Sequence, residues 1–226
     1  MDVVNIMYRF QLGETRVDIP LRFDPVSYDL VPGDGATVAD WTRLDHHQCT
    51  NCPLVPQSQR QCPFAAALAQ VIPAFDGLPS IAEVEVEVVT EQRSISAATT
   101  LQRGMASVIG LVSAASGCPH TRFFRPMARF HLPFATMEET LFRAFSTHLL
   151  GEYFRSGGTS VADVGFERIR AFYAEAEKVN RGMAERLGSV AMSDAALNAI
   201  IILNSFAEVV PYFVEERLSE LEHLFH

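Results

Sequence analysis

The sequence lacks long apolar runs. No apolar run reaches the roughly 18 residues that a membrane-spanning helix needs. The most apolar segment, residues 195–214, is interrupted by two asparagines, a serine, a glutamate and a proline. The first five residues contain no basic stretch followed by an apolar one, so we expect no export signal. The sequence therefore predicts a cytoplasmic protein with no membrane partner.

Positive charge is also scarce. Only one of the 18 lysine and arginine residues, Lys178, is a lysine, and 27 acidic residues give a formal net charge of -9. A general nucleic-acid binder needs a basic surface that displaces counterions from phosphates, so we expect no nucleic-acid partner. The predominance of arginine over lysine is typical of GC-rich bacterial genomes.

Segments with β character come first in the chain. Residues 3–12 and 16–23 flank a short glycine-containing turn, which predicts a hairpin. A third short strand is expected at 28–31. Residues 81–95 form the clearest strand, because three valines alternate there with three glutamates and so separate a buried face from a wet one.

Helical segments dominate the rest of the chain. Helices are predicted at 63–71, 100–116, 137–154, 161–187 and 195–224. The expected fold class is α+β, with a small N-terminal β layer, a cysteine-rich connecting segment, one further strand and a C-terminal group of long helices. We expect one domain over 1–226, divided into a β-rich part (1–44), a cysteine segment (45–63), a mixed part (64–135) and a helical part (136–226).

The four cysteines carry the clearest chemical signal. Cys49 and Cys52 have the C-x-x-C spacing that lets two sulfurs reach one metal ion from a tight turn. Cys62 is expected at a helix start, where free N–H groups favour a thiolate, and Cys118 follows a helix end. In a reducing compartment, cysteines are more often ligands than disulfides. The pattern predicts one metal site with four thiolate ligands.

Several metal states remain open. Zinc is the preferred ion. An iron–sulfur cluster is the alternative, because three of the cysteines precede proline, as in cluster-binding runs. A mixed site, in which His46, His47 or His120 replaces one cysteine, is a further alternative. So is a metal-free protein with cysteines as core residues or as a redox pair.

A second group of charged side chains follows Cys118 in a run, 121–134, that we expect to be irregular. Its three arginines lie within eight residues and, with Arg93, Arg103 and Arg143 as possible neighbours, could bind a carboxylate or phosphate. They could instead pair with acids such as Glu138 and Glu139. The candidates that could support the metal site or bind an anion are His46, His47, His120, Arg122, Arg125, Arg129 and His131.

The sequence favours a metal-binding protein with a structural or regulatory role over an enzyme. Four thiolates would leave zinc no open coordination position for catalysis. One alternative is a metal- or thiol-dependent enzyme that acts on a small anionic substrate near His120, Arg122, Arg125 and Arg129. Another is a metal-free interaction module that forms a homodimer through its C-terminal helices. No glycine-rich phosphate loop, HExxH or G-x-S-x-G motif accompanies these residues.

Overall fold

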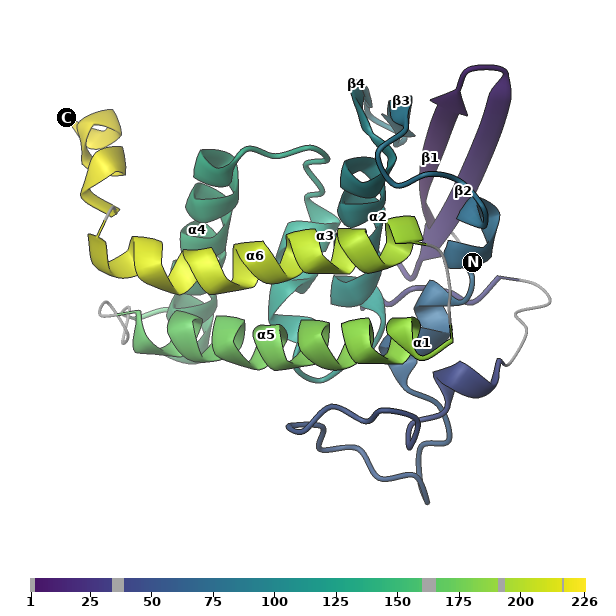
Figure 1. The fold of residues 1–226 in the computed structure, drawn as a ribbon. Coiled ribbons are helices and arrows are strands. Elements are labelled where there is room, and N and C mark those ends of the chain that lie inside the picture. The colour runs from purple at the N-terminus through teal and green to yellow at the C-terminus, as the bar shows by residue number, and fades with distance from the viewer. Residues whose placement is uncertain (1–2, 34–38, 160–165, 191–193, 217) are drawn as a thin grey trace.

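The sheet lies at one end of the protein (Figure 1). The computed structural model describes residues 3–33, 39–159, 166–190, 194–216 and 218–226. Four antiparallel strands have the order β2-β1-β3-β4. They are β1 (Val4–Leu12), β2 (Thr15–Phe23), β3 (Glu83–Val89) and β4 (Ser94–Thr100). The predicted N-terminal hairpin is β1–β2, and Gly13 turns it with a positive φ of 54°.

The strand predicted over 81–95 is two strands. β3 ends at Val89, and the backbone N–H of Thr90 donates to the carbonyl of Arg93 to close a hairpin turn. The Thr90 hydroxyl accepts the backbone N–H groups of Gln92 and Arg93 and stabilises this turn. The predicted third strand, 28–31, contributes only an isolated bridge between Phe23 and Leu30.

The helices follow the predicted order. The α-helices are α1 (Pro63–Leu68), α2 (Leu101–Ala115), α3 (Arg125–Arg129), α4 (Met137–Arg155), α5 (Glu167–Gly188) and α6 (Asp194–Glu216). Short 3-10 helices are η1 (Asp40–Thr42), η2 (Ile72–Phe75), η3 (Arg122–Phe124) and η4 (Leu218–Phe225). The α+β fold class is confirmed. The helix predicted over 63–71 is shorter, because α1 ends at Leu68 and η2 follows before the sheet resumes.

Two helix starts follow from local sequence. Pro63 occupies the first turn of α1, where its missing N–H costs no hydrogen bond. Thr136 and Glu139 form a reciprocal capping box at the start of α4. The residues before position 166 that we assigned to the next helix lie outside the described part of the chain, and α5 begins at Glu167.

Helix α2 joins the sheet to the helical part. It is the most buried helix and packs on α1, α3, α6 and the β3–β4 strands. A Cβ atom on Gly104 would lie 2.7 Å from Phe10 Cε1, so this close approach of α2 to the sheet requires glycine. The larger core surrounds α2, and a smaller one lies among α4, α5 and α6.

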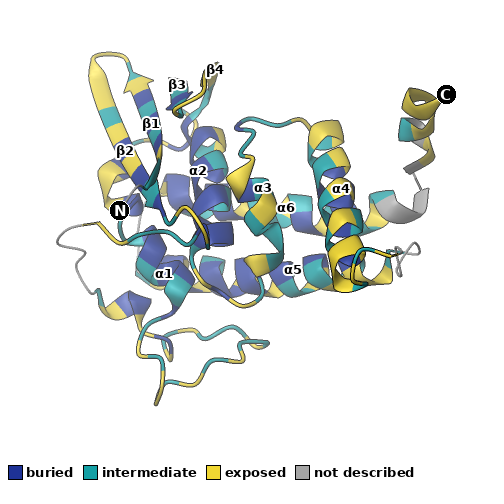
Figure 2. Ribbon diagram, turned by 180° about the vertical axis from the view of Figure 1, so that it is seen from behind, coloured by how far each residue is buried: buried dark blue, intermediate teal, exposed yellow. Residues whose placement is uncertain are grey.

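Helices α5 and α6 run side by side along the molecule, and α4 stands at their far end (Figure 1). Figure 2 shows that α4 carries much exposed surface, in contrast to α2. By length and composition alone, residues Asp194–Phe213 of α6 could span a membrane. Core helices of soluble proteins pass the same test, so this property is weak support for a membrane segment.

Candidate functional site: the cysteine segment and a central cavity

The cysteine segment runs from η1 to α1 without regular helix or strand, and it packs against α5 (Figure 1). An isolated bridge between Arg43 and Gln61 joins its two ends. Within it, the Cys52 N–H donates to the Cys49 carbonyl at 3.0 Å, which closes the C-x-x-C into a tight turn. The turn geometry that the spacing predicted is therefore present.

Helix α5 holds this segment through close contacts with the turn. A Cβ atom on Gly182 would lie 2.8 Å from Cys49 Sγ, so the turn approaches the α5 backbone directly. The Asn51 side chain donates to the Glu175 carbonyl at 3.1 Å and to its carboxylate at 2.8 Å. The sulfur of Cys49 also lies 4.0 Å from the Val179 carbonyl. The Cys49 thiol therefore faces α5.

Arg186 on α5 is the central anchor of the segment. Only 1% of this residue is exposed. Its Nη1 donates to the carbonyls of Trp41 and Arg43, each at 2.6 Å, and its Nη2 lies 3.4 Å and 3.5 Å from the carbonyls of Leu44 and His47. Arg186 takes part in none of the ion pairs found among the described residues. Sequence analysis did not identify it, because nothing local marks an arginine on an amphipathic helix as buried.

The pKa of the Arg186 guanidinium is lowered by burial. The nearby cysteines Cys62, Cys49 and Cys52 oppose this effect, as does Asp45. A buried cation is costly without a compensating anion. The titratable groups that interact with the Arg186 guanidinium are thus three cysteines and one aspartate.

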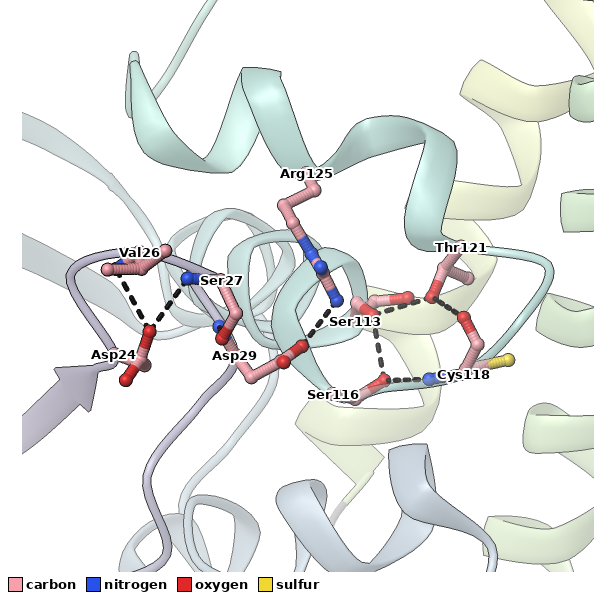
Figure 3. Close-up of polar contacts among 9 residues, drawn as sticks. All are labelled: Asp24, Val26, Ser27, Asp29, Ser113, Ser116, Cys118, Thr121 and Arg125. Atoms are coloured by element: carbon pink, nitrogen blue, oxygen red, sulfur yellow. Dashed lines mark hydrogen bonds and ion pairs between the residues drawn. The ribbon is translucent and has the colours of Figure 1, made fainter.

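The other two cysteines come from neighbouring helix ends. Cys62 precedes α1 and Cys118 follows α2, and both are buried. A Cβ atom on Gly117 would lie 3.9 Å from Pro63 Cβ, so the α1 start and the α2 end are adjacent. The Cys118 backbone N–H donates to Ser116 Oγ at 3.2 Å, and the Thr121 hydroxyl donates to the Ser113 carbonyl at 2.6 Å (Figure 3). These bonds hold the loop that presents Cys118.

Electrostatic interactions connect the four thiols. Burial, and after it the like charges of Cys62, Cys118 and Cys52, raises the pKa of Cys49 to about 12. Burial also raises the pKa of Cys118, which hydrogen bonds from the backbone N–H groups of His120 and Thr121 oppose. Both thiols are thus protonated at neutral pH when no cation is near, and they are poor nucleophiles in that state.

The four cysteines are nevertheless not gathered into a ready metal site. Among the residues that the structure describes, no group of three or more His, Cys, Asp or Glu side chains could hold a metal ion as placed. All four cysteines are free thiols. A physical reason lies at Cys49, whose sulfur points at the α5 backbone. Metal binding is therefore not shown.

The three histidines of this region have protein partners. His46 Nε2 lies 2.9 Å from the Ser189 hydroxyl, and its ring packs edge-on against that of His47. His47 is exposed and has a positive φ of 43°. His120 Nε2 lies 2.7 Å from the Asn51 carbonyl, and its Nδ1 lies 3.5 Å from the Glu175 carboxylate. His120 thus links the loop after α2 to the cysteine turn.

The arginine run is helical where we expected irregular structure. η3 and α3 occupy Arg122–Phe124 and Arg125–Arg129, because residues 122–130 form local backbone hydrogen bonds and Pro126 suits a helix start. Arg125 pairs with Asp29, as Figure 3 shows, and Arg129 lies over the Tyr28 ring at 5.5 Å. Arg122 is exposed. The three guanidinium groups therefore have different surroundings, and the ion pairs among the described residues join none of them to Glu138 or Glu139.

His131 lies apart from the cysteines, in the wall of a central cavity. It hydrogen-bonds the Tyr8 hydroxyl, which lies 2.9 Å from the Ser107 hydroxyl. Burial, and secondarily the charge of Arg143, lowers the pKa of His131 to about 3. This imidazole is therefore neutral at physiological pH and supplies no cation for an anion site.

The cavity itself has a volume of about 690 Å³. It lies among α2, the segment from α3 to the start of α4, and helices α4, α5 and α6. Of its lining, the sequence indicated His131 as a candidate, and Arg103 and Arg143 as possible neighbours of the arginine run. The other lining residues come from elements up to a hundred residues apart, and their spacing along the chain carries no common signal.

The fold and these two regions define an α+β protein with a thiol-rich connecting segment and a partly open cavity between its helices. The chain belongs to the family described as Domain of unknown function (DUF6901), whose family model matches residues 5–226. The match covers nearly all of the chain. No curated protein and no solved structure matches the sequence.

Proposed function

We propose that the cysteine segment binds one zinc ion through Cys49, Cys52, Cys62 and Cys118, and that this ion has a structural role. The observation that carries the proposal is the buried guanidinium of Arg186, which takes part in no ion pair among the described residues and whose titratable neighbours are mainly cysteines. A zinc ion with four thiolates has a net negative charge, so it would supply the anion that this cation lacks.

Local geometry supports the same ligands. The Cys49–Cys52 turn is already closed, and the backbone N–H groups of His120 and Thr121 lower the pKa of Cys118, which favours its thiolate. Zinc binding requires Cys49 to turn from the α5 backbone toward the other sulfurs. Rotation of a loop side chain is a small change compared with unfolding of a helix.

The role that follows is a structural cross-link. The zinc ion would tie the irregular segment to the start of α1 and the end of α2, while Arg186 ties it to α5. Four protein ligands leave no position for water or substrate, so the site would stabilise the fold without catalysing a reaction. A reducing compartment such as the cytoplasm would keep the thiols available.

Metal analysis of protein purified anaerobically tests this proposal. We expect one zinc ion per chain, and a lower unfolding temperature after chelation that added zinc restores. The Cys118→Ser variant should lose the metal. As matched controls, His46→Gln and His120→Gln should retain it, and loss of zinc in either would indicate a mixed histidine–cysteine site.

Other outcomes separate the alternatives. If the purified protein is brown and contains iron and labile sulfide, the same cysteines bind an iron–sulfur cluster and not zinc. Folded protein that contains neither metal, and that does not bind added zinc, would contradict the proposal.

A second candidate function is self-association through the helical part. Helix α4 exposes Phe142, Leu150, Tyr153 and Phe154, which is a large apolar surface for one helix. Light scattering of the intact chain should then give the mass of a dimer, and Phe154→Ser should shift it toward the monomer. A monomeric wild-type chain at high concentration would exclude this function.

A further inference from the structure

We propose that the central cavity is a binding site for a small molecule with an apolar body and one carboxylate group. The cavity volume of about 690 Å³ is within the usual range for small-molecule sites. Its wall is mostly apolar, with a few polar side chains that face the same space. The apolar part of the wall includes Leu111, Met127, Phe134, Leu203, Phe206 and Ala207.

Arg143 on α4 is the cation that would bind the carboxylate. Its Nη2 donates to the carbonyls of Met127 (2.6 Å) and Phe130 (3.1 Å), which hold the guanidinium at the cavity wall. Its Nη1 and Nε form no hydrogen bond with any described residue, and Arg143 takes part in none of the ion pairs found there. Nη1 and Nε of this partly buried guanidinium thus remain available, and because they lie on different edges of the group, each offers a carboxylate one charge-assisted hydrogen bond.

Two buried polar side chains of α5 line the same cavity. Tyr173 is 5% exposed and Asn180 is 7% exposed, so both are more than nine-tenths buried. Neither the Tyr173 hydroxyl nor the Asn180 amide forms a hydrogen bond with another described residue. Neither polar group is among the fully enclosed side-chain atoms that lack a partner, so both remain accessible at the cavity, where a bound ligand can form hydrogen bonds with them.

The remaining polar groups of the wall sharpen the ligand class. His131 is neutral and already bonded to Tyr8, so it adds no positive charge. Arg103 also lines the cavity, but it is exposed to solvent. Arg143 is thus the one partly buried cation among the lining residues, and a monocarboxylate matches its single charge beside a mainly apolar wall.

Calorimetric titration of the full-length protein with decanoate and decanol tests this inference. These probes share an apolar chain and differ in the charged head group. We expect decanoate to bind more tightly than decanol. Arg143→Met should weaken decanoate binding by roughly tenfold or more, the value of a charge-assisted hydrogen bond, and leave decanol binding within about twofold.

Three further variants locate the site. Tyr173→Phe should weaken decanoate binding by roughly threefold to tenfold, since it removes one hydroxyl. Ala106→Leu, which reduces the space inside the wall, should weaken both probes. Arg181→Met is the matched control, because Arg181 is an exposed arginine of α5 paired with Glu177; its affinities should equal those of the wild type.

The outcomes that overturn the inference are distinct. Absence of decanoate binding would overturn it, and so would equal affinity for decanol. Decanoate binding that neither Tyr173→Phe nor Ala106→Leu changes would place the probe elsewhere. Thermal unfolding of each variant shows whether it is folded. If Arg143→Met does not fold, the effect of Tyr173→Phe on decanoate affinity tests the inference.

Discussion

The cysteine segment and the central cavity are organised in opposite ways. The segment is irregular, and its cysteines and histidines lie close together in the sequence. Contacts with helix α5, above all those of Arg186, hold it in place. The cavity is formed mainly by regular helices, and its polar residues are scattered from Thr99 to Asn180. The cysteine segment thus has a recognisable sequence motif and little regular secondary structure. The cavity has regular secondary structure around it and no sequence motif.

The two regions are therefore stabilised by different kinds of interaction. The cysteine segment depends on a few strong polar contacts, above all the four carbonyls that face Arg186. The cavity wall depends on apolar packing of α2, α5 and α6, which loses little when one polar side chain is removed. Substitutions should therefore affect the two regions unequally.

The largest expected effect is that of Arg186→Met. The change removes the donor of the buried Trp41 carbonyl and leaves the Arg43 carbonyl only the His46 N–H, so we expect the free energy of unfolding to fall by roughly 3–5 kcal/mol. Chemical denaturation measures it. The control Arg181→Met, on the exposed face of the same helix, should change it by less than about 0.5 kcal/mol. Equal effects of the two substitutions would show that Arg186 does not anchor the segment.

The next effect concerns the cavity and pH. The folded-state pKa of His131 is about 3, below its ordinary value of 6.5, so the unfolded chain binds a proton more readily. Stability from this residue is complete above pH 6.5 and is lost as the pH falls toward 3, at up to about 1.4 kcal/mol per pH unit. Denaturation between pH 7 and pH 4 should show this slope, and His131→Phe should reduce it. An unchanged slope in the variant would mean that His131 is solvated.

A smaller effect is expected where the turn contacts α5. Gly182→Ala places a methyl group 2.8 Å from Cys49 Sγ, so the segment must shift, and we expect a loss of about 1–3 kcal/mol together with faster labelling of Cys49 by a thiol reagent. Gly188→Ala is the control, because nothing lies within 4 Å of its new Cβ; it should be neutral or stabilising. If both variants label at the wild-type rate, the segment does not pack closely on α5.

The smallest effect is expected at the start of α4, beside the cavity. Thr136→Ala removes the hydroxyl that accepts the Glu139 N–H in the capping box, and it should cost about 1 kcal/mol. Thermal unfolding measures the change. Thr136→Ser retains the cap and should restore most of the loss. A larger effect of Thr136→Ala than of Arg186→Met would reverse the comparison between the two regions.

Much of the fold could be predicted from local patterns. The alternation of valine and glutamate in β3, the capping box of α4 and Pro63 at the start of α1 each depend on interactions within a few residues, and the structure confirms them. The division of 81–95 into two strands was missed, because the turn at Thr90–Arg93 has neither glycine nor proline. The helices of the arginine run were missed because η3 and α3 are too short to show a helical periodicity in the sequence.

The candidate sites divide in the same way. The sequence by itself determined the C-x-x-C turn, the position of Cys62 at a helix start and that of Cys118 just beyond a helix end, because these features depend on neighbouring residues. Only the tertiary structure decided that Arg186 is buried among the carbonyls of the segment. It also decided that Cys49 faces α5 and that Arg143, Tyr173 and Asn180 share a cavity. These features depend on contacts between residues far apart in the chain, which no local pattern encodes.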